Sequence, residues 1–312
     1  MNFATVNERL ARLKQSPADR VEAYLRFLCD RYDVGLNLHD IAGISEMDER
    51  LSVVFAPYLY HNNPFCNYLK KNEAAFRSCA RSKNVLCRMC SRTEEPFYGS
   101  CYMGVEEMRF PIRWNGRLIA FLCVGQFCSD PRAADERLTR QAAKYGLDAE
   151  ELKDRYRATT KPLTLDVEEL HAHVGMLSEY IALLYEKFLL TARSAQNIDT
   201  VAESHKRSYI VHRTVEYIKE NYMYPITLKA LASGSYCSEA YLSHLFKEKT
   251  GQTITEYINK LRVQRAKQLL DVTSVTVTDI AHQCGFNDSN YFARVFRQHV
   301  GKSPKQYRER RQ

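Results

Sequence analysis

The sequence predicts two folded parts: an α+β domain, then an all-α domain in which a long helix joins two helix-turn-helix units. Three observations predict this arrangement. The chain has 312 residues and is 45% hydrophobic, which is enough for more than one core of ordinary size. A segment of alternating polarity with an Asn-Gly turn lies near the middle of the chain. The last third contains an internal repeat.

Composition argues against a membrane protein and a secreted protein. The longest nearly apolar run, Leu118 to Phe127, is about half of the roughly 20 residues that a membrane-spanning helix needs. The first residues, Met1 to Lys14, lack the apolar core of a secretory signal. We therefore expect a cytoplasmic protein without contact to a membrane. In a reducing cytosol its ten cysteines are expected as thiols or metal ligands rather than disulfides.

The first part of the chain, residues 1–165, contains a strong hairpin signal. Arg109 to Trp114 alternates polar and apolar residues, and Asn115-Gly116 favours the positive φ angles of a type I′ turn. Leu118 to Phe127 then returns as a mostly apolar strand. The other elements expected here are a helix at Arg20 to Tyr32, a strand at Gly35 to Ile41 and a helix at Asn67 to Asn84. Together they predict an α+β domain.

One long helix is expected from Asp166 to Ser194, where Asp166 and Glu169 can form a capping box. Its apolar residues alternate spacings of three and four: Val167, Leu170, Val174, Leu177, Ile181, Leu184 and Phe188. This stripe is typical of a coiled coil, so it predicts either a homodimer through Val167–Phe188 or packing on the chain's own first domain. Residues 194–208 are polar and are interpreted as a linker. The helix and this linker together form the predicted middle segment, residues 166–208.

Half of the cysteines lie within 36 residues: Cys66, Cys79, Cys87, Cys90 and Cys101. Thiolates bind zinc, copper(I) and iron–sulfur clusters, and the CxxC pair of Cys87 and Cys90 can place two on one metal. A second close pair, typical of four-cysteine zinc sites, is absent. Cations that could stabilise a thiolate are close in sequence: Arg77, Arg81, Arg88 and Arg92. A thiolate-bound metal and a low-pKa sensing thiol therefore stay open as alternatives.

Residues 209–312 contain the repeat. Leu231-Ala232 recurs as Ile280-Ala281, and after a one-residue insertion four further features recur 50 positions on. These are Tyr241-Leu242, Leu245-Phe246, Gly251 and Tyr257, which recur as Tyr291-Phe292, Val295-Phe296, Gly301 and Tyr307. The residues suited to cap the two helices of each copy are Thr227 and Ser238, then Thr276 and Asp288. Each copy is therefore predicted to be a helix-turn-helix unit.

The outer face of each second helix carries residues that can contact DNA bases. In the first copy they are Ala240, Ser243, His244 and Lys247, and in the second copy Asn290, Ala293, Arg294 and Arg297. Arginine suits the edge of guanine and asparagine that of adenine, so we expect more direct base recognition by the second copy. Residues 201–312 carry 18 Lys and Arg but 10 Asp and Glu, the entire excess of the chain's +8 charge. Double-stranded DNA is therefore the expected partner.

The segment from Tyr209 to Arg310 resembles the AraC-type DNA-binding domain. The resemblance rests on SEAYLSHLFKEKTGQTITEYINKLRVQRAKQLL and VTDIAHQCGFNDSNYFARVFRQHVGKSPKQYR. It implies that a long helix, here Ile254 to Leu270, places both recognition helices in successive major grooves, and that RNA polymerase is a partner. The positions that match base contacts of the family are Ala240, Ser243, His244, Ser289, Asn290 and Arg294. Tyr236 departs from the family, which usually has Gly in the first turn.

Residues Ala18 to Phe127 resemble the PocR sensory domain. The motifs are FCNYLKKNEAAFRSCARS and GSCYMGVEEMRFPIRWNGRLIAFLCVGQF, with Cys66, Cys79 and Cys101 at pattern positions. Cys87 and Cys90 lie outside the pattern. The resemblance implies a PAS-like α+β fold that senses a small molecule, with simple alcohols or other short hydrocarbon derivatives as the ligand class.

The sequence thus predicts a DNA-binding transcriptional regulator whose first domain responds to a small-molecule effector. The alternatives are a regulator that senses redox state or a metal such as zinc or an iron–sulfur cluster, and an Ada-type alkyl-acceptor repair regulator. The last needs two short-spaced cysteine pairs, whereas this chain has one. We expect no enzyme activity, because the chain has no glycine-rich phosphate loop, no HExxH motif and no nucleophile elbow.

Overall fold

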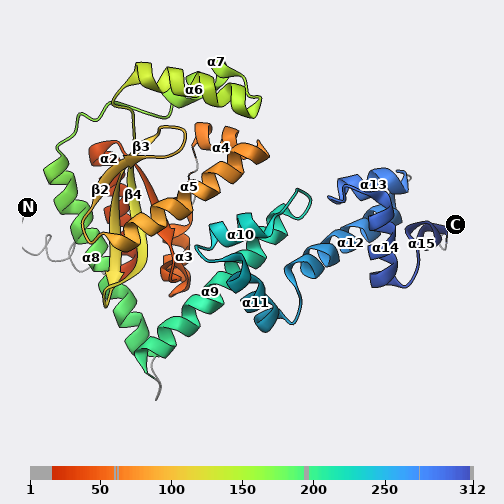
Figure 1. The fold of residues 1–312 in the computed structure, drawn as a ribbon. Coiled ribbons are helices and arrows are strands. Elements are labelled where there is room, and N and C mark those ends of the chain that lie inside the picture. Colours follow the sequence, from red (N-terminus) through yellow and green to blue (C-terminus); the bar gives the residue numbers. More distant parts are fainter. Residues whose placement is uncertain (1–15, 60, 62, 193–196, 274, 310–312) are drawn as a thin grey trace, which may run out of the picture. The chain divides into compact units, whose positions relative to one another are not determined.

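A computed structural model shows two compact units, which divide after Lys206 (Figure 1). The structure describes residues 16–59, 61, 63–192, 197–273 and 275–309. The interpretation of Met1 to Lys14 lies outside these residues. Among the residues described, no helix has the length and apolar character needed to cross a bilayer.

The first unit is built on a four-stranded antiparallel sheet with the strand order β1-β4-β3-β2. The strands are β1 (Gly35–Asp40), β2 (Phe97–Ser100), β3 (Glu106–Trp114) and β4 (Arg117–Phe127). The predicted hairpin joins β3 to β4, and its turn residues Asn115 and Gly116 have φ angles of 48° and 73°. These positive angles are those of a type I′ turn, which continues the twist of the two strands.

One face of the sheet is apolar and carries the main core. Met108, Phe110, Ile112 and Trp114 alternate along β3 and point to this face, because successive side chains of a strand point to opposite sides. Two helices cover it, α2 (Pro17–Tyr32) and α8 (Val167–Ala192) (Figure 1). The sheet, these helices and the helices on its other face confirm the predicted α+β class.

The apolar stripe of α8 packs on its own sheet rather than on a second chain. Leu170, Val174, Leu177 and Ile181 are buried in the main core, and Leu184 and Phe188 lie partly buried against it. Most of the stripe is therefore inaccessible to a partner, which contradicts a homodimer through it. A contact stripe on a helix looks the same in the sequence whether its partner is a sheet or another helix.

The opposite face of the sheet is covered by α5 (Glu73–Arg92), which follows the short helix α4 (Pro64–Lys70). The sequence predicted one helix from Asn67 to Asn84, and this is wrong in two ways. The helix is interrupted at Asn72, whose side chain accepts a hydrogen bond of 3.0 Å from the amide of Ala75 and so begins a new helix. That new helix continues for two turns beyond the predicted end.

Further helices complete the first unit: α3 (Glu49–Phe55), α6 (Pro131–Tyr145) and α7 (Ala149–Arg157), with short 3-10 helices at Ile44–Glu46 and Ala56–Tyr58. A second core joins α4, α6 and α7, where Phe65 packs edge-to-face on Tyr156. The space between this second core and the sheet is where the pocket described below lies.

The expected linker at residues 194–208 is helical from Ile198 on, where α9 (Ile198–Asn221) begins. Residues 194–196 lie outside the described part. Ala202 is buried in the main core of the first unit, and Ile198 and Val201 pack against it. These few apolar contacts explain the helix, although they are too short a stripe to stand out in a polar sequence.

The second unit consists of helices, as predicted. After α9 come α10 (Leu228–Gly234), α11 (Glu239–Thr250), α12 (Ile254–Val272), α13 (Val277–Gln283), α14 (Ser289–Val300) and α15 (Pro304–Glu309). The unit has two small cores, one per repeat. The predicted long helix α12 contributes to both, with Ile254 and Ile258 in the first core and Val263, Ala266 and Leu270 in the second.

Candidate nucleic-acid interface and ligand pocket

All four predicted capping residues begin their helices. The hydroxyls of Thr227, Ser238 and Thr276 each accept one backbone hydrogen bond of 3.1 Å from the third residue on. The carboxylate of Asp288 accepts two, from Asn290 at 2.6 Å and Tyr291 at 2.9 Å. Because these bonds stabilise the carboxylate, they hold the pKa of Asp288 below its usual range. Local sequence thus sets where both recognition helices begin.

The turns of the two helix-turn-helix repeats have different residues at equivalent positions. In the second helix-turn-helix Gly285 has a φ of 89°, and a Cβ added there would lie 2.7 Å from the carbonyl oxygen of Met223. In the first helix-turn-helix Tyr236 occupies the equivalent position with a φ of 54°, which is also left-handed. Tyr236 in place of glycine therefore keeps the left-handed turn conformation, although a non-glycine backbone is strained there.

The eight predicted DNA-contacting residues lie on solvent-accessible faces of α11 and α14. Ala240, His244, Lys247, Asn290, Arg294 and Arg297 are exposed, and Ser243 and Ser289 are half-buried. The opposite face of each helix is buried, with Leu242, Leu245 and Phe246 in one and Phe292, Val295 and Phe296 in the other. The arrangement leaves each outer face available to a partner.

The two outer faces differ in charge. On α11, Glu248 accepts a hydrogen bond of 2.7 Å from Arg207, and its carboxylate lies 3.8 Å from Nδ1 of His244. The helix α14 contains no acidic residue and presents Arg294 and Arg297. The guanidinium of Arg294 lies over the ring of Tyr291, 5.3 Å from its centre, which restricts the arginine before it meets any ligand.

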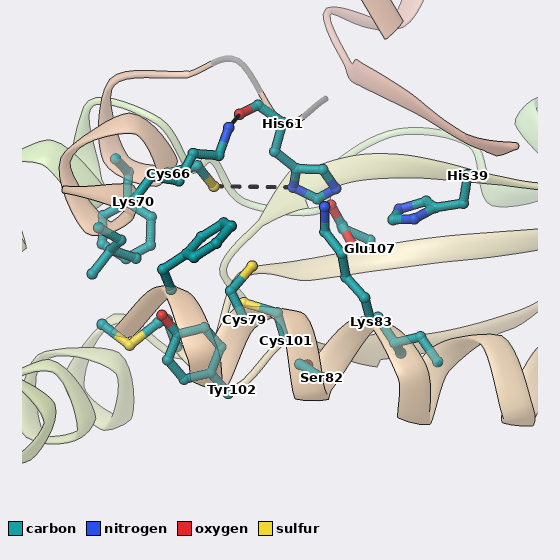
Figure 2. Close-up of a pocket in the computed structure, with 15 residues that line it drawn as sticks. His39, His61, Cys66, Lys70, Cys79, Ser82, Lys83, Cys101, Tyr102 and Glu107 are labelled. Atoms are coloured by element: carbon teal, nitrogen blue, oxygen red, sulfur yellow. Dashed lines mark hydrogen bonds and ion pairs between the residues drawn. The ribbon is translucent and has the colours of Figure 1, made fainter. Parts of the chain in front are cut away.

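In the first unit a pocket lies between the sheet, α4, α5 and the segment after β2 (Figure 2). The empty space between its lining atoms is about 610 Å³, which includes space open to solvent, and little of it is wide enough for a water molecule. Most of the lining is apolar, with Phe65, Leu69, Phe76, Leu86 and Met103 among its residues. Such a pocket suits a small, narrow molecule.

Three of the five clustered cysteines line this pocket: Cys66, Cys79 and Cys101. Cys87 and Cys90 do not, because they lie on later turns of α5, where Cys90 is buried. The structure therefore separates the CxxC pair from the other three. Among the described residues, no group of three or more His, Cys, Asp or Glu has an arrangement that could hold a metal ion.

Cys66, Cys87 and Cys101 have a raised pKa instead of the lowered pKa that the neighbouring arginines suggested. Burial raises the pKa of Cys66 to about 12 and that of Cys101 to about 11, and it raises the pKa of Cys87 as well. The four arginines point to solvent along α5, where their charges are screened by water. The expectation of a low-pKa thiol is therefore not supported for these three, since the thiolate is the reactive form.

Polar residues that the sequence did not single out line the same pocket: His39, His61, Lys70, Lys83 and Glu107. Nδ1 of His61 lies 3.8 Å from the Glu107 carboxylate and 4.0 Å from Sγ of Cys66. Lys70 donates a hydrogen bond of 2.6 Å to the carbonyl of His61. Figure 2 shows Lys83 extending from α5 toward His61 and Glu107. One signal was available, because Glu107 begins the alternating pattern that continues with Arg109.

Glu107 and Arg109 form a buried pair on the polar face of the sheet. Their side chains are 4% and 0% exposed, and Nη2 of Arg109 lies 3.5 Å from the Glu107 carboxylate. Burial raises the pKa of Glu107, and the guanidinium of Arg109 opposes that shift. Burial, with the charges of Lys83 and Lys70, lowers the pKa of His61 to about 3, so its imidazole is neutral at physiological pH.

Comparison with known families matches both units. Residues 41–186 match the family model of the sensory domain found in PocR, and residues 231–310 match that of a helix-turn-helix domain. The curated relatives of the second region are AraC-family regulators. The chain therefore carries an AraC-type helix-turn-helix domain and a PocR sensory domain. Both resemblances in the sequence are thereby confirmed.

Two relatives illustrate the AraC match. The uncharacterized HTH-type transcriptional regulator YijO of Escherichia coli (strain K12) is 43% identical over 93 residues, 30% of this chain and 33% of that protein. The HTH-type transcriptional activator RhaR of Salmonella typhi is 29% identical over 133 residues, 43% of this chain and 47% of RhaR. The matched segments thus span between a third and about half of these curated relatives.

Solved structures match the same AraC-type region. A probable AraC family transcriptional regulator from Rhodopseudomonas palustris CGA009 is 32% identical, with a TM-score of 0.31, over 32% of this chain and 95% of that one. The DNA-binding domain of AdpA, solved with a target DNA, is 26% identical, with the same TM-score of 0.31, over 32% of this chain and 89% of that one. The PocR match extends beyond the motifs quoted above and includes α6, α7 and most of α8.

Proposed function

We propose that this AraC-family protein is a transcriptional regulator that binds double-stranded DNA through α11 and α14 and responds to a small molecule bound by its PocR domain. The observation that carries the proposal is the pair of equivalent helices, each buried on one face and open on the other. The names of the relatives YijO and RhaR, both described as transcriptional regulators or activators, support it.

The outer face of α14 carries most of the sequence recognition in this proposal. Arg294 and Arg297 have the donors that suit guanine edges or phosphates, and Asn290 suits adenine. On α11 the contacts come from Ala240, Ser243, His244 and Lys247, with fewer donors. Ser289, at the start of α14, completes the set. The acidic residues near these faces, Glu239 and Glu248, both lie on α11, whereas α14 has none.

The pocket supports a short hydrocarbon derivative as the effector, since its lining is mostly apolar and its free space is narrow. A ligand-dependent coupling of about 1 to 3 kcal/mol would change DNA affinity roughly 5- to 150-fold. In the full proposal, residues 1–165 bind the effector, 166–208 connect the domains and 209–312 bind DNA. The protein then acts in the cytoplasm, and RNA polymerase is its further partner.

The experiment that tests DNA recognition uses the full chain and a library of duplexes from which bound sequences are selected. We expect footprints about one helical turn apart on one side of the selected DNA, and an affinity that falls as salt rises. Arg294→Ala should weaken binding to the selected DNA. Arg265→Ala is the matched control, because Arg265 is exposed on α12 and lies outside both outer faces. Binding that is unaffected by concentrated salt, or no selected sequence, would contradict the proposal.

A further inference from the structure

The pocket of the first unit has more positive than negative charge. Its cations are Lys70 and Lys83, and Arg109 lies behind the sheet-side wall. The one carboxylate, that of Glu107, is paired with Arg109 at 3.5 Å. Lys70 donates hydrogen bonds to the carbonyl of His61 and to the side chain of Asn67, at 2.6 and 3.4 Å.

Lys83 is the lining cation without a direct ion pair or hydrogen bond among the described residues, although its charge acts on the nearby carboxylate of Glu107. It is half-buried in the pocket wall, and within the described part of the chain it has no ion pair within 4.0 Å and no hydrogen bond. A partly desolvated ammonium without a counter-ion is costly, and an anion placed beside it would be bound more strongly than in water.

A second polar group points to the same place. Nε2 of His61 is buried and has no hydrogen-bond partner among the residues that the structure describes, and the His61 side chain is 18% exposed. The imidazole is neutral, so Nε2 can donate a hydrogen bond when it carries the ring proton. Figure 2 shows that His61 and Lys83 lie together near Glu107, whereas Tyr102 lies at the other end of the pocket.

We propose that the effector is a short monocarboxylate, whose carboxylate lies between Lys83 and His61 and whose hydrocarbon chain contacts Phe65, Leu69 and Met103. This inference rests on the proposed sensing function and specifies its ligand. The single charge follows from the balance of groups: one carboxylate neutralises Lys83, while a second negative charge would meet no further cation without a hydrogen-bond partner among the described lining residues and would add to the repulsion from Glu107. The narrow free space and apolar lining fit a short alkyl chain.

The test compares butyrate with 1-butanol and succinate on the full chain, by isothermal titration calorimetry and by ligand-induced shifts of thermal unfolding. We expect butyrate to bind at least tenfold more tightly than either of the others. Lys83→Met should weaken butyrate binding at least tenfold and leave 1-butanol unchanged, and Lys83→Arg should keep butyrate binding. Lys187→Met, at an exposed lysine on α8, is the matched control.

Three outcomes would overturn the inference, and each bears differently on the sensing function. If 1-butanol binds as tightly as butyrate, or Lys83→Met weakens both equally, the domain senses a small molecule but not through a carboxylate. If neither ligand binds, the carboxylate assignment fails, while DNA binding by α11 and α14 is tested independently by Arg294→Ala. The circular dichroism spectrum of Lys83→Met without ligand shows whether the variant folds, and Lys83→Gln replaces it if it does not.

Discussion

In α11 the carboxylate of Glu248 accepts a hydrogen bond from Arg207 and lies beside His244, whereas α14 has no acidic residue and presents two arginines. The two helices nevertheless have the same pattern of burial, residue for residue, from Tyr241 to Thr250 and from Tyr291 to Val300. Their caps and their left-handed C-terminal glycines are also equivalent. One backbone arrangement therefore carries two faces of different charge.

This difference shows that fold and recognition depend on separate residues in this domain. The inner stripe and the caps determine the helices, and the outer stripe is free to differ because it contacts no core. The turns extend the comparison, because Tyr236 and Gly285 adopt similar angles with different side chains. The predictions below test how far the two units are equivalent, from the largest effect to the smallest.

Gly285→Ala should have the largest effect and destabilise the second helix-turn-helix by about 3 kcal/mol or more. The added Cβ would lie 2.7 Å from a backbone oxygen, and the φ of 89° is unfavourable for alanine. Native-state hydrogen exchange in peptides from α13 and α14 measures the loss. Gly301→Ala is the control, since its φ is 81° but no atom lies within 4 Å, and it should cost only about 1 kcal/mol. Equal losses would show that the close approach is unimportant.

Arg294→Ala should weaken binding to the selected DNA by about 1 to 3 kcal/mol and relax the preference at one base pair. His244→Ala, at the equivalent position of the first unit, should cost less than about 1 kcal/mol, because Glu248 lies beside it. Fluorescence anisotropy on the selected duplex and on single-base variants measures both. Uniform weakening by Arg294→Ala on every sequence would instead indicate a phosphate contact.

Glu248→Gln should strengthen DNA binding by about 0.5 kcal/mol at low salt, because it removes a negative charge from the outer face of α11. The reverse change at the equivalent position, Gln298→Glu, should weaken binding by a similar amount. Both effects should disappear as salt approaches 1 M, where charges are screened within about 3 Å. Weaker binding by Glu248→Gln, stronger binding by Gln298→Glu, or effects independent of salt would show that these positions do not face the phosphates.

Tyr236→Gly should change the free energy of unfolding by less than about 1 kcal/mol. Glycine relieves the left-handed strain at φ 54°, but it also gains conformational entropy in the unfolded chain, and the two effects offset each other. Hydrogen exchange in peptides from α10 and α11 measures the change. A loss of several kcal/mol would mean that the tyrosine side chain, rather than the backbone, determines this turn.

Much of the fold was predictable because it depends on neighbouring residues. Asp288, Ser238 and their counterparts cap helices within three residues, and the Asn115-Gly116 turn joins strands that meet directly. The recognition faces followed from helical periodicity alone, since one inward stripe defines the outward one. The break at Asn72 was within reach of the same reasoning, because its side chain caps the helix that begins at Glu73.

The pocket could not be predicted in the same way. His61, Lys83 and Glu107 come from three separate elements, and only the packing of α5 on the sheet brings them together. The cysteines show the same limit. Their spacing suggested one cluster, but α5 turns Cys79 toward the pocket and carries Cys90 away from it. Burial then raised the pKa of Cys66, an effect that no count of nearby arginines contains.

The sequence by itself determined the repeat, the caps, the outward residues of α11 and α14 and the excess of positive charge in the last third, because each depends on spacing or composition. Tertiary structure alone decided what covers the stripe of α8, which side of the sheet is polar and which charges meet in the pocket. The physical reason is that periodicity specifies which face of an element is buried, while the partner that buries it depends on contacts between residues far apart in the chain.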